Sequence, residues 1–113
     1  CTNLMMWPTT NSNVEIVIPD TVTSANAKIA VSGTLQIFGT SNYSAKITSS
    51  HASNTAKFEF TGGRAQNVMY LDATRINATG GNTIWCKEQG AMTGSTGFGL
   101  LTDGFMAPLT TLN

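Results

Sequence analysis

The side chains that most often carry chemistry are few in this chain and far apart in the sequence. His51 is the single histidine, and the two cysteines are Cys1 and Cys86. A zinc site would need both cysteines, His51 and a carboxylate from distant segments, and the cysteines lack CxxC spacing. The acidic residues are also dispersed: Glu15, Asp20, Glu59, Asp72, Glu88 and Asp103. We therefore expect no metal site and no cofactor.

The elements that would have to position a catalytic group argue against one. A nucleophilic triad can be written from His51, either Asp72 or Asp103, and a serine. His51, however, lies in the segment SSHASN between two expected strands, where an exposed histidine without a catalytic role is common. The dispersed carboxylates give no pair across a cleft for glycoside hydrolysis. The segment GSTGFG at residues 94–99 lacks the lysine of a phosphate-binding loop. The sequence favours a protein that is not an enzyme.

Composition predicts a secreted, β-rich chain. The 113 residues contain only 11% charged residues, and six Lys and Arg balance six Asp and Glu. Thr, Ser, Asn and Gly replace the missing charge, and these residues suit strands and tight turns. The balance excludes the basic surface that nucleic acid requires. No apolar run reaches the length of a membrane span, and the length fits one domain over residues 1–113.

Alternating apolar and polar residues predict short strands. The clearest run covers residues 29–37, with Gly33 expected as a bulge or bend. Two hairpins are expected, one from residues 43–48 and 57–61, the other from residues 74–78 and 83–87. Further strands are expected at residues 14–18 and 68–71. The resulting prediction is an all-β domain built on a single antiparallel sheet with irregular loops.

The two cysteines predict a disulfide between Cys1 and Cys86, as is usual in a secreted chain. Two free buried thiols are the alternative, as is a lipid on Cys1, which would exclude the bridge. Because the sequence begins at Cys1 and not at Met, we expect that a leader or larger precursor was removed.

Two apolar stretches are candidates for a partner interface, with packing inside the core as the alternative. The first comprises Leu4, Met5, Met6 and Trp7, and the second includes Phe98, Leu100 and Phe105. Trp7 and Trp85 could also stack on sugars. Two N-glycosylation sequons begin at Asn42 and Asn77 and would be acceptors in a glycosylating pathway.

Several segments resemble the headgroups of bacterial type IV pilins. An aromatic-led strand, a Ser/His loop and a second strand followed by a glycine pair cover residues 43–63. The turn, strand and cysteine GGNTIWC at residues 80–86 resemble a late pilin segment, and Cys1, Leu4 and Trp7 resemble the point where such pilins leave their helix. The similarity spans roughly residues 1–88.

The resemblance implies a non-enzymatic structural subunit of an extracellular type IV pilus or pseudopilus, at a bacterial cell surface or in the periplasm, with a role in adhesion or secretion. The long apolar N-terminal helix of such pilins is missing, so the resemblance implies either a truncated headgroup or a split pilin. In a split pilin a separate helical chain supplies the filament core, and the partners are that chain and further copies of this one. The alternatives are a secreted β-sandwich adhesin or carbohydrate-binding module, a lipoprotein and a phage decoration domain.

Overall fold

Within the described residues, the alternating segments form ten strands and no helix. The computed structural model describes residues 1–8 and 12–100, with the backbone alone for residues 88–90. The strands are β1 (Asn3–Met6), β2 (Val14–Ile18), β3 (Lys28–Val31), β4 (Thr34–Phe38), β5 (Ala45–Ser49), β6 (Ala56–Phe60), β7 (Gln66–Thr74), β8 (Ile76–Asn77), β9 (Ile84–Thr93) and β10 (Phe98–Leu100).

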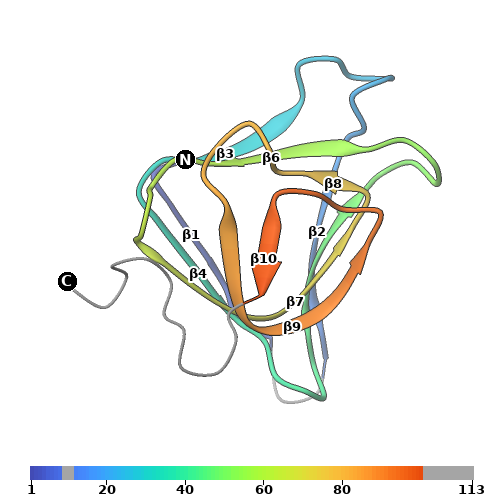
Figure 1. Cartoon of the computed structure of the whole chain (residues 1–113). Coiled ribbons are helices and arrows are strands. Elements are labelled where there is room, and N and C mark those ends of the chain that lie inside the picture. Colours follow the sequence, from blue (N-terminus) through green and yellow to red (C-terminus); the bar gives the residue numbers. More distant parts are fainter. Residues whose placement is uncertain (9–11, 101–113) are drawn as a thin grey trace.

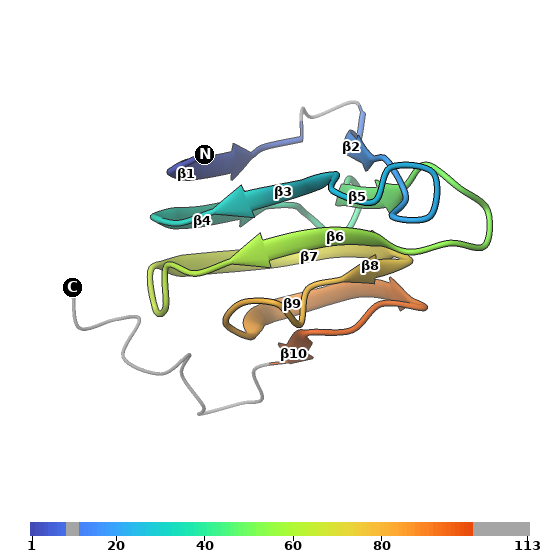
Figure 2. The same ribbon diagram turned by 90° about the horizontal axis from the view of Figure 1, so that it is seen from above.

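Every pairing between these strands is parallel. A seven-stranded sheet follows the order β1-β4-β7-β5-β2, with β9 against β7 and β10 against β9. A three-stranded sheet follows the order β3-β6-β8. Figure 2 shows the strands stacked in successive layers from β1 to β10. The chain therefore winds as a parallel coil, in which each turn lies on the previous one.

The coil has three faces because the long sheet turns a corner within β7. The first half of β7 pairs with β4 and the second half with β5, and Tyr70 between them has a φ of 51°. We call the β1, β4 and β10 side, with the first halves of β7 and β9, the first face. The β2 and β5 side, with the second halves, is the second face. The short sheet is the third face, and the three enclose the interior (Figure 1).

The predicted antiparallel sheet and both predicted hairpins are wrong. β5 pairs with β2 and β7, whereas β6 pairs with β3 and β8 in the other sheet. The second expected hairpin is not formed either. Residues 74–78 lie at the end of β7 and in β8, and residues 83–87 lie in β9, which pairs in parallel with β7 and β10 and not with β8. In each strand of a parallel coil, successive side chains point alternately toward the interior and toward solvent. The sequence of such a strand therefore shows the same two-residue alternation as a strand of an antiparallel hairpin.

One interior runs through all the layers. Inward side chains stack along the coil, for example Leu35 beside Gln66 and Ile37 beside Val68. The buried apolar residues are Met6, Ile18, Val31, Leu35, Ile37, Ala45, Ile47, Ala56, Phe58, Phe60, Val68, Leu71, Ala73, Ile76, Ala78, Ile84 and Cys86. These residues form one hydrophobic cluster, which accounts for most of the favourable free energy of folding.

Gly33 lies at a bend, one of the two alternatives expected, and this bend is a corner of the coil. It ends the third face and begins the first, and its N–H donates to the Thr2 carbonyl at 2.6 Å. Gly62 occupies the equivalent corner of the next layer, where an added Cβ would lie 1.9 Å from the Gly33 carbonyl oxygen. The layers can stack closely here because neither residue has a side chain.

Candidate functional surfaces

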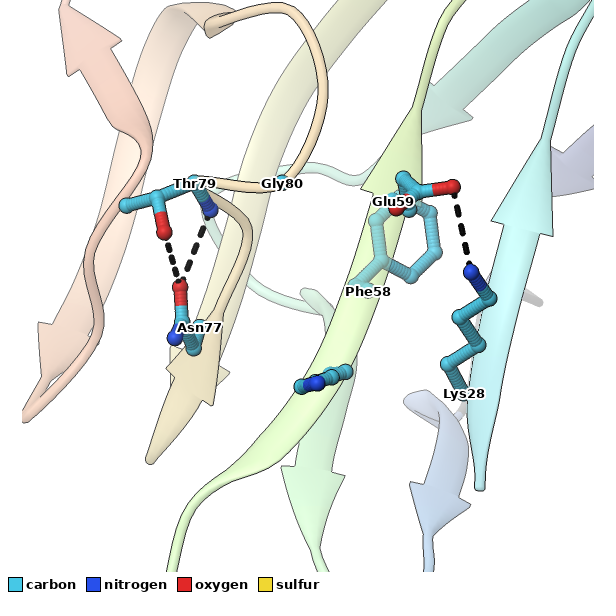
Figure 3. A pocket seen from close by; sticks show the side chains of 7 residues that line it. Lys28, Phe58, Glu59, Asn77, Thr79 and Gly80 are labelled. Carbon is cyan, nitrogen blue, oxygen red and sulfur yellow. Dashed lines mark hydrogen bonds and ion pairs between the residues drawn. The ribbon is translucent and has the colours of Figure 1, made fainter. Parts of the chain in front are cut away.

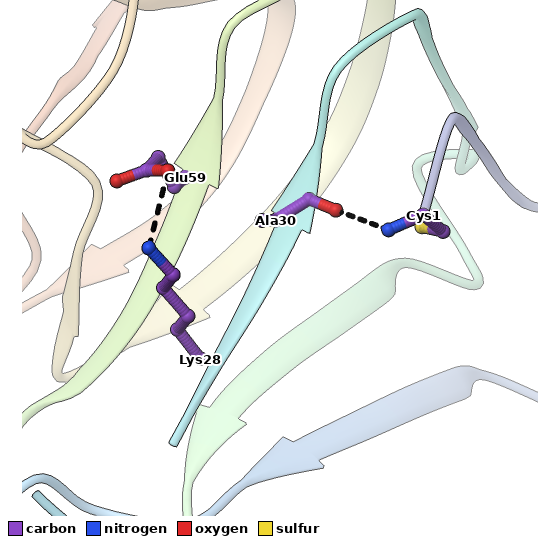
Figure 4. Close-up of polar contacts among 4 residues, drawn as sticks. All are labelled: Cys1, Lys28, Ala30 and Glu59. Carbon is purple, nitrogen blue, oxygen red and sulfur yellow. Dashed lines mark hydrogen bonds and ion pairs between the residues drawn. The ribbon is translucent and has the colours of Figure 1, made fainter. Parts of the chain in front are cut away.

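The predicted Cys1–Cys86 disulfide is absent, because both residues are free thiols. Cys1 is exposed, and its ammonium group donates to the Ala30 carbonyl at 2.6 Å (Figure 4). Cys86 is buried in β9, which is separated from β1 by β4 and β7. Three strand spacings amount to roughly 14 Å, beyond the Cα–Cα limit of about 7 Å for a disulfide. Burial raises the pKa of the Cys86 thiol to about 12.

Most of the first predicted interface stretch lies in β1, an edge strand of the first face that was not expected from the sequence, and Trp7 follows directly after this strand. Its residues alternate, so the stretch does not act as a unit. Met6 is buried in the core, which corrects its assignment to a partner interface, and Leu4 packs partly against the same core. Met5 and Trp7 are exposed, at 55% and 68%.

Met5 and Trp7 are exposed on the outer side of the first face, where Met5 is opposite Gln36 in the register and Trp7 contacts an aromatic ring. The Trp7 ring meets the Phe38 ring edge-on, with 5.8 Å between centroids and 74° between planes. Met69 of β7 is opposite Phe38 of β4 in the strand register, and both side chains are half-buried. We call Met5, Trp7, Phe38 and Met69 the apolar outer patch. On the second face, the outward positions include the charged residues Glu15, Lys46 and Asp72 together with exposed Val17.

The second predicted interface stretch lies at the other edge of the same face. Phe98 and Leu100 belong to β10, which pairs with β9. Phe98 packs partly against the core, and Leu100 is 48% exposed. β4, β7 and β9 separate this edge from β1, so the structure places the two stretches on one face without bringing them together. Phe105 lies outside the described residues.

Trp85 is half-buried on the first face, between β7 and β10. Its backbone N–H donates to Oε1 of buried Gln66 at 2.7 Å. Its ring lies over Gly99, where an added Cβ would be 2.6 Å from the ring atom Cζ3. Trp85 is thus packed into the face, whereas Trp7 is the exposed tryptophan.

A pocket of about 250 Å³ lies on the outer side of the third face. Its lining comes from all three strands and the turn after β8: Lys28, Lys57, Phe58, Glu59, Asn77, Thr79 and Gly80. Figure 3 shows Lys28, Glu59 and Asn77 arranged around it. Lys28 and Lys57 are opposite each other in register, as are Lys57 and Asn77. The pocket is therefore a direct product of parallel stacking.

Two polar contacts fix the walls of this pocket. The Lys28 ammonium lies 3.3 Å from Oε1 of Glu59 and forms an ion pair with it. On the opposite wall, Oδ1 of Asn77 accepts hydrogen bonds from the Thr79 hydroxyl at 2.6 Å and from its N–H at 3.0 Å. Asn77 stands out in the sequence because of its sequon. The two lysines do not, because Lys28, Lys57 and Asn77 are 29 and 20 positions apart and meet only through the strand register.

His51 lies in an exposed loop, as expected, and there it closes the backbone. Its Nδ1 accepts hydrogen bonds from the N–H groups of Ser53 at 3.1 Å and Asn54 at 3.3 Å. An Nδ1 that accepts from the backbone places the ring proton on Nε2. The Ser53 hydroxyl lies 3.3 Å from the same Nδ1, within this turn.

Asp20 is the most heavily hydrogen-bonded carboxylate among the described residues. It is buried at the end of β2 and accepts hydrogen bonds from the Thr23 hydroxyl and N–H, from the amide of Asn54 and from the Val22 N–H. These bonds, led by the one from the Thr23 hydroxyl, hold its pKa well below the usual range. Through these bonds Asp20 connects the loop after β2 to the loop that contains His51, so its role is structural.

The described residues hold no group of three or more His, Cys, Asp or Glu side chains placed to bind a metal ion. Within the same part of the chain, no helix has the length and apolar character needed to cross a membrane. The chain matches no family model, no curated protein and no solved structure.

Proposed function

We propose that the chain is a non-enzymatic structural subunit of an extracellular filament of the type IV pilus or pseudopilus class, and that it docks through the apolar outer patch. The observation that carries the proposal is the exposure of Met5 and Trp7 on one face of the parallel sheet, with the Trp7 ring against Phe38. Exposed apolar groups gathered on one face are typical of surfaces that are covered in an assembly. A filament subunit hides such a surface against its neighbours.

The proposed occupant of the patch is an apolar helix supplied by a separate pilin chain, with copies of this chain as further neighbours. The four side chains of the patch are themselves uncharged, which suits an apolar helix because none of them has to be desolvated as an ion. The pilin resemblance contributes this partner. It now rests on the sequence alone, because the two segments expected to form its hairpin lie in different sheets.

Site-specific cross-linking in cells tests this proposal. A photoreactive residue at position 5 is predicted to capture a short apolar helical chain or a second copy in sheared surface filaments. The matched control places it at position 15, which is outward on the second face. Filaments that contain the chain, with equal capture at both positions, would contradict docking through the patch. Recovery of the native protein only as a monodisperse monomer would contradict the filament role.

A carbohydrate-binding module is the second candidate, and the pocket on the third face favours it. Ammonium, amide, hydroxyl and carboxylate groups line that pocket together, and sugars bind through such mixed donors and acceptors. The two candidates use different faces of the coil, so they can be tested separately.

A further inference from the structure

The pocket on the third face contains an unmatched positive charge. Lys28 and Lys57 are direct register partners on adjacent parallel strands, so their Cα atoms are about 5 Å apart. Like charges in this arrangement destabilise a sheet. Glu59 pairs with Lys28 at 3.3 Å, and no ion pair of Lys57 is present among the described residues. The three side chains together leave one positive charge, which a single negative charge on a ligand would balance.

The remaining polar groups of the pocket suit hydroxyl groups. Asn77 uses its Oδ1 to accept from Thr79, and its Nδ2 group remains as a donor. Glu59 uses Oε1 for Lys28, and its Oε2 is directed to Gly80, 3.0 Å from where a Cβ would be. The absence of a side chain at Gly80 keeps this oxygen accessible. A sugar hydroxyl can donate to Glu59 and accept from Asn77.

The Glu59 carboxylate also discriminates between anions. A phosphate or sulfate ion concentrates its negative charge around one small centre, so in this pocket that charge would lie close to Glu59 and be repelled by it. A sugar acid places its one carboxylate at one end and neutral hydroxyls elsewhere, so its charge can lie on Lys57 while a hydroxyl faces Glu59. The pocket therefore combines attraction for one carboxylate with attraction for neutral hydroxyls.

We propose that this pocket binds a uronic acid residue of an acidic polysaccharide, with the carboxylate on Lys57 and hydroxyls on Glu59 and Asn77. The inference rests on the second candidate function and gives that function its ligand class. It is independent of the apolar outer patch, which lies on the first face.

Calorimetric titration of the purified chain with a uronic acid trisaccharide tests the proposal. The neutral trisaccharide of the same linkage and inorganic phosphate are the comparison ligands. The uronic acid trisaccharide is expected to bind at least about tenfold more tightly than either, because only it satisfies both the ammonium and the carboxylate. Equal affinity for the acidic and neutral trisaccharides, tighter binding of phosphate, or no binding of the acidic one would overturn the proposal.

Matched variants locate the site. Lys57→Gln is expected to weaken binding of the uronic acid trisaccharide about tenfold. Lys87 is an exposed lysine on the first face, and Lys87→Gln should leave this affinity unchanged. Glu59→Gln should increase phosphate binding, since it removes the repelling charge and leaves two unpaired lysines. Circular dichroism confirms that each variant is folded. Equal losses for Lys57→Gln and Lys87→Gln would show nonspecific charge attraction and overturn the assigned site.

The filament assay separates the two proposals. If the wild-type chain assembles into filaments but binds no sugar, this inference and the second candidate function are overturned and the filament role is not. Sugar binding by a chain that never assembles would contradict the filament role alone.

Discussion

At the scale of single residues, the two thiols have opposite environments. Cys1 is exposed and Cys86 is buried, with a pKa raised to about 12. The thiolate is the reactive form of cysteine, so Cys86 is expected to be inert in the folded chain. Ellman's reagent should therefore detect one thiol per folded chain and two after denaturation. A chain with no reactive thiol in either state, and a mass two hydrogens lower, would instead contain the disulfide.

Asp20 gives a second prediction at this scale. The folded-state pKa is lowered, so the ionised carboxylate stabilises the fold above its unfolded pKa of about 4, and this contribution is lost as the pH falls toward the folded pKa. Asp20→Ala is expected to lower the urea midpoint at pH 7 and to have a smaller effect at pH 3. Glu15→Gln, which removes the charge from a single hydrogen bond with Thr48, is the control and should change the midpoint less. An Asp20→Ala effect of the same size at both pH values would contradict the linkage.

At the scale of the elements, most strand positions could be predicted but their partners could not. Residues 14–18, 43–48 and 57–61 were expected as strands and overlap β2, β5 and β6, whereas β1 was not expected. Alternation shows which side chains face the interior, but it is the same for parallel and antiparallel neighbours. The loop between β5 and β6 is short enough for a hairpin, yet it carries the chain from the second face to the third. That information lies in the packing of successive layers and not in either segment.

The corner glycines test the layered arrangement. Gly62→Ala is predicted to destabilise the fold by about 3 kcal/mol, since the new methyl group would overlap the Gly33 carbonyl oxygen and the backbone must shift. Gly63→Ala is the matched control. Its Cβ meets no atom within 4 Å, but its φ is +66°, which costs about 1 kcal/mol for a residue with a side chain. Denaturant unfolding measures the free energy of unfolding of both variants. A larger loss of this free energy for Gly63→Ala than for Gly62→Ala would contradict the close contact between layers.

At the scale of the whole molecule, the candidate site could be predicted only in part. The sequence placed Met5 and Trp7 at a candidate interface, and the structure leaves both exposed on the first face. Met6 was also expected at that interface. All four residues of the stretch are apolar, so the sequence alone does not show which of them point inward. The pocket on the third face was not predictable, since Lys28, Lys57 and Asn77 are brought together only by the strand register.

We propose above that the apolar outer patch holds the chain in an extracellular filament. Electron microscopy of surface filaments from cells that carry Met5→Ser together with Trp7→Ser tests it most directly, with Val17→Ser as the control because Val17 is exposed on the second face. Filaments are expected to be lost in the double variant and retained in the control, while both purified chains keep the circular dichroism of the wild type. Normal filaments from the double variant would show that the patch does not hold the chain in the filament.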